Sequence, residues 1–240
     1  MQQSQKGPLG AQGYVPALGF DFLTPLYDLF LRFFMREQTL KRRLVDQAAI
    51  HPGDAVLDVG CGTGTLAILV KQSVPQARVV GLDGDPKVLA IAREKIAQGG
   101  LDVELVEGMA YAPPLPCASF DRVLSTLVFH PLTRDEKRAA LAGIRSLLRP
   151  GGELHVADFG PPDGLYAHVV FSIIRYFDGA ERTRDNLKGR LPQLIAEAGF
   201  DEVHETGHVA TPFGTLVYLS AKVSGRLALE EKRETAATHA

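Results

Sequence analysis

The sequence predicts an α/β fold in which a doubly wound, mostly parallel sheet of seven strands ends in an antiparallel hairpin. Three observations lead to this prediction. Short apolar runs alternate with helical patterns, most of these runs end at turn residues, and the last two runs have no helix between them. The chain has 240 residues, of which 45% are hydrophobic, so it is long enough to bury one core of this kind.

The chain reaches the sheet through a helical region. Apolar residues recur at helical spacing between Phe20 and Ile50, which predicts one or two amphipathic helices, and residues 1–19 are expected to be flexible. Five parallel strands are expected next, each a short apolar run. They are Ala55–Val59, Arg78–Leu82, Val103–Val106, Arg122–Phe129 and Glu153–Asp158.

Capping residues mark the helices between these strands. Asp85, directly before Pro86, is typical of a helix start. Thr133 and Glu136 have the spacing of a capping box, and the sequence Pro150–Gly152 is expected to end the helix that follows them. The expected helices are Leu66–Ser73, Pro86 to about Gln98, Arg134–Arg149 and Leu187–Ala198.

The end of the chain differs because no crossover helix fits between the last two strands, Phe200–Glu205 and Thr215–Ala221. Strands joined this closely pair antiparallel, so we expect a hairpin at the edge of the sheet. The sequence therefore predicts one domain over residues 51–222, with an insertion at 160–186 and a flexible tail at 223–240.

Charge and cysteine content exclude several classes of protein. The 26 basic and 28 acidic side chains give a net charge of -2, so nothing favours nucleic acid as a partner. Two cysteines are too few for a disulfide-stapled secreted scaffold, and the first residues lack the pattern of a signal peptide. We therefore expect a cytoplasmic protein.

A glycine-rich turn at Gly60, Gly62 and Gly64 follows the first expected strand. Glycines here let a ligand approach the backbone, and the next helix presents unpaired N–H groups. Asp83 ends the second strand, where a carboxylate can take both hydroxyls of a ribose. An NAD(P)-dependent oxidoreductase stays open as an alternative, but its fingerprint needs the third glycine at position 65, which is Thr65.

Together with Leu57 and Asp58, this turn resembles the first motif of class I S-adenosylmethionine-dependent methyltransferases. The resemblance continues through three more motifs in order and spans about Pro52 to Asp158. The pair Tyr27–Asp28 looks most like the ubiquinone and menaquinone-biosynthesis methyltransferases and the related soluble phospholipid N-methyltransferases. The three further motifs are Val80–Pro86, Phe120–His130 and Leu148–Leu154.

The resemblance implies a Rossmann-like fold, S-adenosylmethionine as cofactor, and methyl transfer to a small lipophilic acceptor such as a quinone, lipid or amine. One position departs from the family, because Met109 stands where an aspartate often holds the adenine amino group. A thioether packs on the ring instead, and the backbone at Ala110 is the remaining polar partner. A non-catalytic cofactor-binding protein therefore stays open as an alternative. The residues implied at the cofactor are Asp58, Gly60, Cys61, Gly62, Gly64, Asp83, Gly84, Met109 and Ala110.

Two side chains at strand ends are candidate catalytic residues. His130 ends the fourth strand and Asp158 the fifth, so both are expected at the carboxyl edge of the sheet, where ligands bind in such folds. His130 is either a base for the acceptor or a wall of its pocket, and Asp158 either binds the acceptor or caps the next loop. Cys61 is expected to be a packed thiol rather than a nucleophile.

The insertion at 160–186 is unusually apolar. It indicates either a lid over a lipophilic acceptor or a dimer contact, and it leaves a peripheral membrane contact and a homodimer open as partners. The residues expected to line the lid are Tyr166, Val170, Ile174 and Phe177.

A zinc-protease pattern, His-Glu-x-x-His, occurs at His204 and His208. That chemistry needs both histidines one turn apart on a helix. This segment alternates like a strand, in which the two rings would lie roughly 13 Å apart at about 3.3 Å per residue. We therefore expect surface histidines on an edge strand and no metal site.

Overall fold

The computed structural model describes residues 37–161, 184–211 and 214–224. Its seven strands form one sheet in the order β3-β2-β1-β4-β5-β7-β6. Strands β1 to β5 pair in parallel, and β7 runs antiparallel between β5 and β6, which confirms the predicted sheet and hairpin. The strands are β1 (Ala55–Val59), β2 (Arg78–Asp83), β3 (Val103–Glu107), β4 (Phe120–Thr126), β5 (Leu148–Phe159), β6 (Asp201–Thr211) and β7 (Gly214–Lys222).

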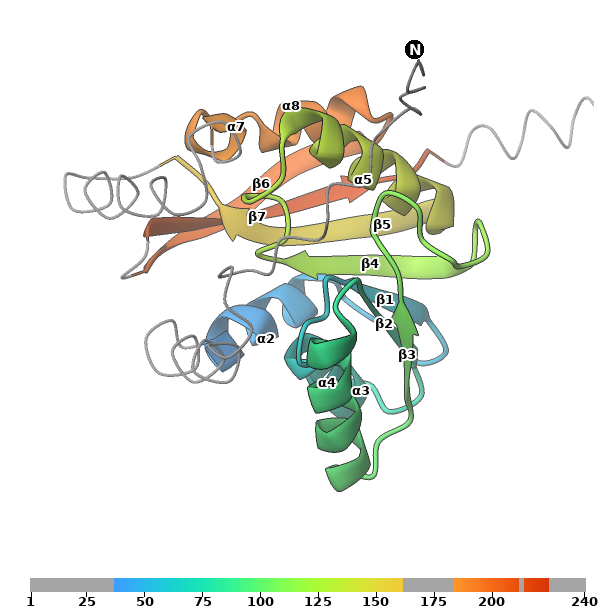
Figure 1. Ribbon diagram of the computed structural model, residues 1–240. Coiled ribbons are helices and arrows are strands. Elements are labelled where there is room, and N and C mark those ends of the chain that lie inside the picture. Colours follow the sequence, from blue (N-terminus) through green and yellow to red (C-terminus); the bar gives the residue numbers. More distant parts are fainter. Residues whose placement is uncertain (1–36, 162–183, 212–213, 225–240) are drawn as a thin grey trace, which may run out of the picture.

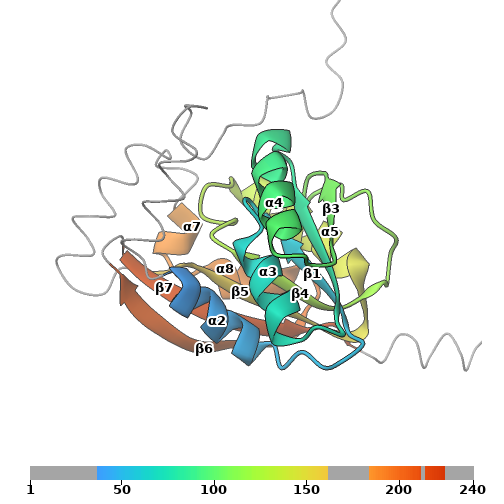
Figure 2. The ribbon, with the colours of Figure 1, turned by 90° about the horizontal axis from the view of Figure 1, so that it is seen from below.

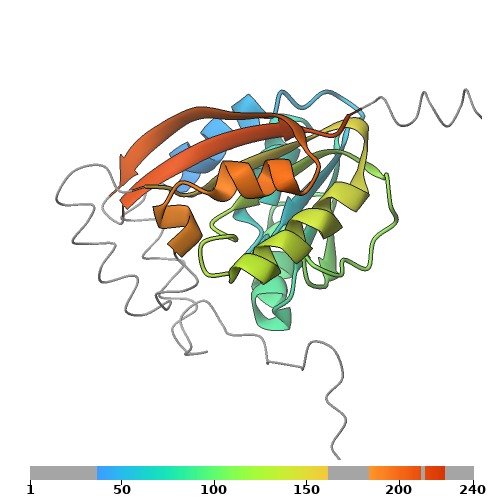
Figure 3. The ribbon, with the colours of Figure 1, turned by 90° about the horizontal axis from the view of Figure 1, so that it is seen from above.

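Helices cover both faces of the sheet (Figure 1). In Figure 2, α2, α3 and α4 lie on one face, and in Figure 3, α5, α7 and α8 lie on the other. The described helices are α2 (Glu37–Gln47), α3 (Thr65–Ser73), α4 (Pro86–Gln98), α5 (Arg134–Leu147), α7 (Arg184–Leu187) and α8 (Leu191–Glu197).

Each face of the sheet has its own apolar cluster because side chains alternate along a strand. In β1, Leu57 packs in the cluster that contains Leu141 of α5, whereas Val56 packs in the cluster that contains Leu66 of α3. Every residue of β1 is buried. This is typical of a parallel strand with helices on both sides.

The predicted boundaries around the fourth and fifth strands were wrong. Helix α5 ends at Leu147, two residues early, and β5 begins at Leu148 and includes Pro150–Gly152, the residues expected to end the helix. Gly151 has φ +82° and donates its N–H to the Val223 carbonyl at 2.9 Å, so this irregular part of β5 is joined to the residue that directly follows β7. Strand β4 ends at Thr126 because the next residue, Leu127, has φ +58°.

The predicted helix Leu187–Ala198 is shorter in the structure, where α8 begins at Leu191 and ends at Glu197, and a separate short helix, α7, ends at Leu187. Gly189, with φ +63°, lies between the two helices and reverses the backbone. Strand β6 is longer than predicted and extends to Thr211, with register shifts against β7. The hairpin therefore begins as expected but reaches further along the sheet edge.

Several predictions lie outside the described residues. These are the flexible residues 1–19, the helical pattern before residue 37, the lid residues Tyr166, Val170, Ile174 and Phe177, and the tail from residue 225. Within the described ranges, none of the helices has the length and apolar character needed to cross a membrane.

Candidate functional site

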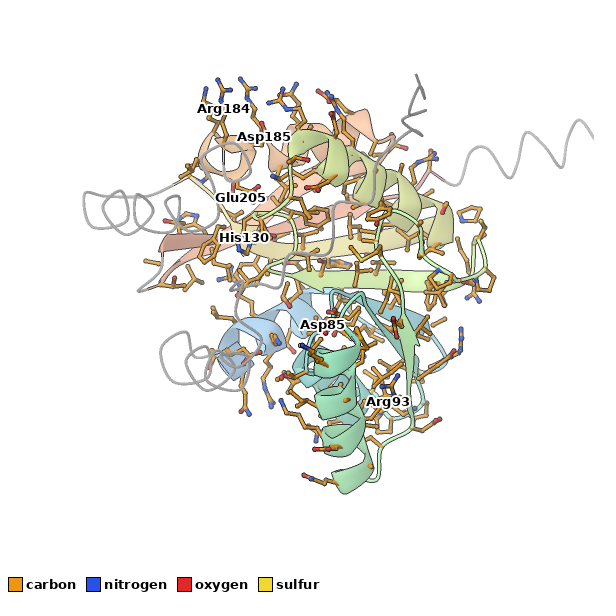
Figure 4. All side chains as sticks on the ribbon, in the orientation of Figure 1. Asp85, Arg93, His130, Arg184, Asp185 and Glu205 are labelled. Atoms are coloured by element: carbon orange, nitrogen blue, oxygen red, sulfur yellow. The ribbon has the colours of Figure 1, made fainter. Side chains whose placement is uncertain are left out.

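The parallel strands bring the predicted site residues to one edge of the sheet. Because β1, β2, β4 and β5 run in the same direction, the loops at their carboxyl ends are neighbours. Figure 4 shows His130 between Asp185 of α7 and Asp85 at the start of α4. The glycine-rich turn and Asp83 follow β1 and β2 at the same edge.

The glycine-rich turn is held against the end of β2. The N–H groups of Gly60 and Cys61 donate to the Leu82 carbonyl at 2.8 and 3.1 Å. A Cβ on Gly60 would lie 2.3 Å from Cγ2 of Val128, so a larger residue does not fit there. Gly62 differs, because a Cβ there would meet nothing within 4 Å. The turn therefore combines one tightly packed glycine with one that leaves room for a ligand.

Asp83 is oriented by two backbone hydrogen bonds. Its Oδ2 accepts the Gly62 N–H at 2.8 Å, and its Oδ1 accepts the Asp85 N–H at 2.9 Å. Burial raises the pKa of Asp83, and these hydrogen bonds oppose the rise. A carboxylate offers about four lone-pair positions, so each oxygen can accept one further donor such as a ribose hydroxyl.

Asp58 presents a buried oxygen that lacks a donor. Its Oδ2 accepts the Ala67 N–H at 3.1 Å, whereas its Oδ1 has no hydrogen-bond partner. Burial raises the pKa of Asp58 to about 7, and the charge of Lys41 on α2 opposes the rise. An unsatisfied buried acceptor costs about 1–3 kcal/mol, which a ligand with a cationic N–H group would relieve. The acceptor at Asp58 therefore fits a cofactor that carries an ammonium group.

Replacing Asp58 with asparagine is expected to flatten the pH dependence of stability between about pH 4 and 7. The buried carboxyl keeps its proton up to about pH 7, whereas in the unfolded chain it loses it near about pH 3.9. The folded state therefore binds more protons in this window, and the free energy of unfolding falls as pH rises, by up to about 1.4 kcal/mol per pH unit. Urea denaturation of both proteins at several pH values measures this slope. Equal slopes would contradict the prediction.

The end of β3 places a thioether beside β2. A Cβ on Gly84 would lie 2.3 Å from Sδ of Met109, so the two residues are in close contact. The carbonyl of Ala110 points to α5, where a Cβ on Gly143 would lie 2.3 Å from it. Two groups were predicted to contact the adenine ring. Met109 lies beside the loop after β2, whereas the carbonyl of Ala110 points toward α5.

His130 and Asp158 form a buried pair between the ends of β4 and β5. Nδ1 of His130 lies 3.0 Å from Oδ1 of Asp158, and the imidazole packs edge-on against Phe159 with ring centres 5.0 Å apart. Asp158 also accepts the backbone N–H groups of Phe129 and Phe159 at 2.6 and 2.7 Å. Because an ionised carboxylate only accepts, Nδ1 carries a proton in this pair and Nε2 is the nitrogen that can accept one.

A buried lysine that the sequence analysis missed lies near this pair. Lys137 of α5 is fully buried and donates to the Leu132 carbonyl. Burial lowers the pKa of Lys137 to about 8, and the charges of Asp158 and Asp185 oppose the change. Its position one turn before Leu141, on the apolar stripe of α5, is the pattern that could have identified it.

Helix α7 supplies two more side chains that the sequence did not predict. Asn186 donates to the Phe159 carbonyl at 2.9 Å, and its Oδ1 is buried without a partner. Asp185 is paired with Arg134 of α5, which lowers the pKa of Asp185. No local pattern marks either residue, because their role depends on where α7 packs.

The histidines of the zinc-protease pattern lie elsewhere. His204 and His208 are exposed on β6, the edge strand, which confirms the predicted strand position. No group of three or more potential metal ligands is found in the part of the chain that the structure describes. The cysteine of the glycine-rich turn, Cys61, is buried as predicted, and burial raises the pKa of its thiol.

Comparisons with known proteins bear on the identity of this site. Residues 56–152 match a methyltransferase domain family. The demethylmenaquinone methyltransferase of Thermus thermophilus is 39% identical over 166 residues, which cover 67% of this chain and 74% of that protein. The demethylmenaquinone methyltransferase of Listeria monocytogenes is 30% identical over 226 residues, which cover 81% of this chain and 92% of that protein.

A solved structure agrees in fold. The magnesium protoporphyrin IX methyltransferase of Synechocystis, crystallised with bound SAH, has a TM-score of 0.63 and 23% identity, and the likeness covers 78% of this chain and 84% of that one. The glycine-rich turn with its open side and the buried acceptor at Asp58 are compatible with the same kind of cofactor. This chain belongs to the class I S-adenosylmethionine-dependent methyltransferases, and S-adenosylmethionine is its cofactor.

Proposed function

We propose that this methyltransferase acts on a small lipophilic acceptor of the hydroquinone type and that His130 takes the proton of the acceptor. The observation that carries this proposal is the His130–Asp158 pair at the edge of the sheet where the cofactor residues also lie. The names of the two sequence relatives, both demethylmenaquinone methyltransferases, support a quinone-type acceptor.

The cofactor residues follow the order of the strands in this proposal. Met109 after β3 packs on the adenine ring, Asp83 after β2 binds the ribose hydroxyls, and the turn after β1 holds the methionine part. Gly62 admits the ligand, whereas Gly64 packs closely on Ala92 of α4 and shapes the turn. The next two strands in the sheet are β4 and β5, and the acceptor binds at their carboxyl ends in this proposal.

When bound, S-adenosylmethionine supplies a methyl group already activated by the positive sulfonium, so alignment provides much of the rate. The chain itself moves one proton. Nε2 of His130 accepts the hydroxyl proton of the acceptor, which makes the acceptor ring electron-rich and nucleophilic. The ring carbon that takes the methyl group then gives up its own hydrogen as a proton to the ring oxygen, which restores the hydroxyl group and the aromatic ring. Asp158 holds the imidazole in position and stabilises the imidazolium that forms.

Parallel assays with three acceptors test the acceptor class. Purified protein is incubated with S-adenosylmethionine and a short-chain demethylated naphthohydroquinone, the same compound as its oxidised quinone, or phosphoethanolamine. We expect mass spectrometry to detect methylation of the hydroquinone alone, because only this form is a ring with a hydroxyl proton for His130 to remove. Methylation of phosphoethanolamine, with neither ring compound modified, would overturn the proposal.

A further inference from the structure

The first turn of α2 adds two charged side chains beside the glycine-rich turn. We propose that Glu37 and Lys41, together with Asp58, recognise the amino-acid end of S-adenosylmethionine. Lys41 binds the α-carboxylate, and the carboxylates of Glu37 and Asp58 bind the α-ammonium group. Neither Glu37 nor Lys41 belongs to any of the sequence motifs described above.

Packing brings α2 to the cofactor residues. Leu40 and Leu44 of α2 share an apolar cluster with Leu66 and Ala67 of α3, the helix that follows the glycine-rich turn. Between the two leucines, the charge of Lys41 acts on both Asp58 and Cys61. The first turn of α2 therefore lies beside the end of β1, although it is separated in the sequence from the glycine-rich turn.

The two carboxylates each have a buried oxygen without a donor. Five buried side-chain atoms lack a hydrogen-bond partner in the described ranges, and the only carboxylate oxygens among them are Oε2 of Glu37 and Oδ1 of Asp58. The exposed fraction is 7% for Glu37 and 1% for Asp58. An ammonium group has three donors, so one ligand group can satisfy both oxygens.

Charge balance points to the same ligand. Lys41 forms an ion pair with Oε1 of Glu37 one helical turn away, and its side chain is only 14% exposed. With Asp58 ionised, the three side chains offer two negative charges to the α-ammonium group and one positive charge to the α-carboxylate. Each buried oxygen without a donor destabilises the folded state. A purely structural role of the Glu37–Lys41 ion pair, holding α2 on the domain, therefore does not explain these oxygens.

Calorimetry with two ligands separates the amino-acid end from the rest of the cofactor. S-Adenosylhomocysteine has the amino-acid end, whereas 5′-deoxy-5′-methylthioadenosine keeps the adenine, ribose and sulfur but lacks it. We expect Lys41→Met and Glu37→Gln to weaken S-adenosylhomocysteine binding about 10- to 100-fold, as for loss of hydrogen bonds between charged groups. Binding of methylthioadenosine should change less than about twofold.

Two further variants serve as controls. Arg42→Met removes a charge from the next residue of α2, which is exposed, and should alter neither affinity. Lys41→Arg keeps the charge and should retain most of the affinity for S-adenosylhomocysteine. Unchanged binding of methylthioadenosine by Lys41→Met shows that its loss of S-adenosylhomocysteine binding is not a folding defect. Equal weakening of both ligands, or unchanged binding of S-adenosylhomocysteine, would overturn the proposal. Because no methyl transfer is measured, the result is independent of the acceptor.

Discussion

Replacing His130 with alanine is expected to lower kcat about 10²- to 10⁴-fold, the range that general-base catalysis supplies. The imidazole is held by Asp158 at 3.0 Å and by the edge-on contact with Phe159, so its Nε2 is oriented before the acceptor binds. The affinity for S-adenosylhomocysteine should stay within about twofold of wild type, because in the proposed arrangement His130 faces the acceptor. Single-turnover rates and calorimetry measure the two quantities separately.

The matched control is His204→Ala, which removes an exposed histidine from the edge strand β6 and should leave kcat unchanged. An unchanged kcat in the His130 variant would assign this side chain to the wall of the acceptor pocket. A loss of S-adenosylhomocysteine affinity as large as the loss in kcat would instead place it in the cofactor pocket.

Replacing Asp83 with alanine is expected to weaken S-adenosylhomocysteine binding by about 1.5–3 kcal/mol, or about 10- to 150-fold, the scale for hydrogen bonds to a charged group. In the proposed site the carboxylate accepts both ribose hydroxyls. It also holds the Gly62 and Asp85 N–H groups, so the variant loosens the turn as well. Titration calorimetry at one pH and salt concentration gives the change directly.

Asp83→Asn separates the two contributions, since the amide keeps one oxygen acceptor but loses the charge, and an intermediate affinity is expected. Asp102→Ala is the control, because Asp102 is fully exposed and lies before β3, away from the carboxyl edge. Wild-type affinity in Asp83→Ala would remove this residue from the cofactor site.

Local sequence patterns were sufficient for much of this fold. The bounds of β1 and of α4 agree with the prediction at both ends, and the Thr133 capping box is present. Side-chain periodicity, turn residues and helix caps depend only on residues that are close together in the sequence, so they can be recognised without the tertiary structure. The glycine-rich turn and Asp83 could also be placed from the sequence. Each lies at or directly after the end of a strand, and the carboxyl ends of parallel strands lie at one edge of the sheet.

Contacts between distant residues decided the rest. Strand β5 extends through Pro150–Gly152 because this segment pairs with Val223 near the end of the described chain, and no local pattern contains that partner. No local pattern contains both members of the His130–Asp158 pair either, because they are 28 residues apart in the sequence.

The sequence by itself therefore determined the class of fold, the cofactor turn and the identity of the family. Only the tertiary structure showed that Lys137 is buried near Asp158 and that Lys41 acts on Asp58 from another helix. The physical reason is that burial and electrostatic interaction depend on which elements pack together, and packing follows from the strand order and the helix positions of the whole chain.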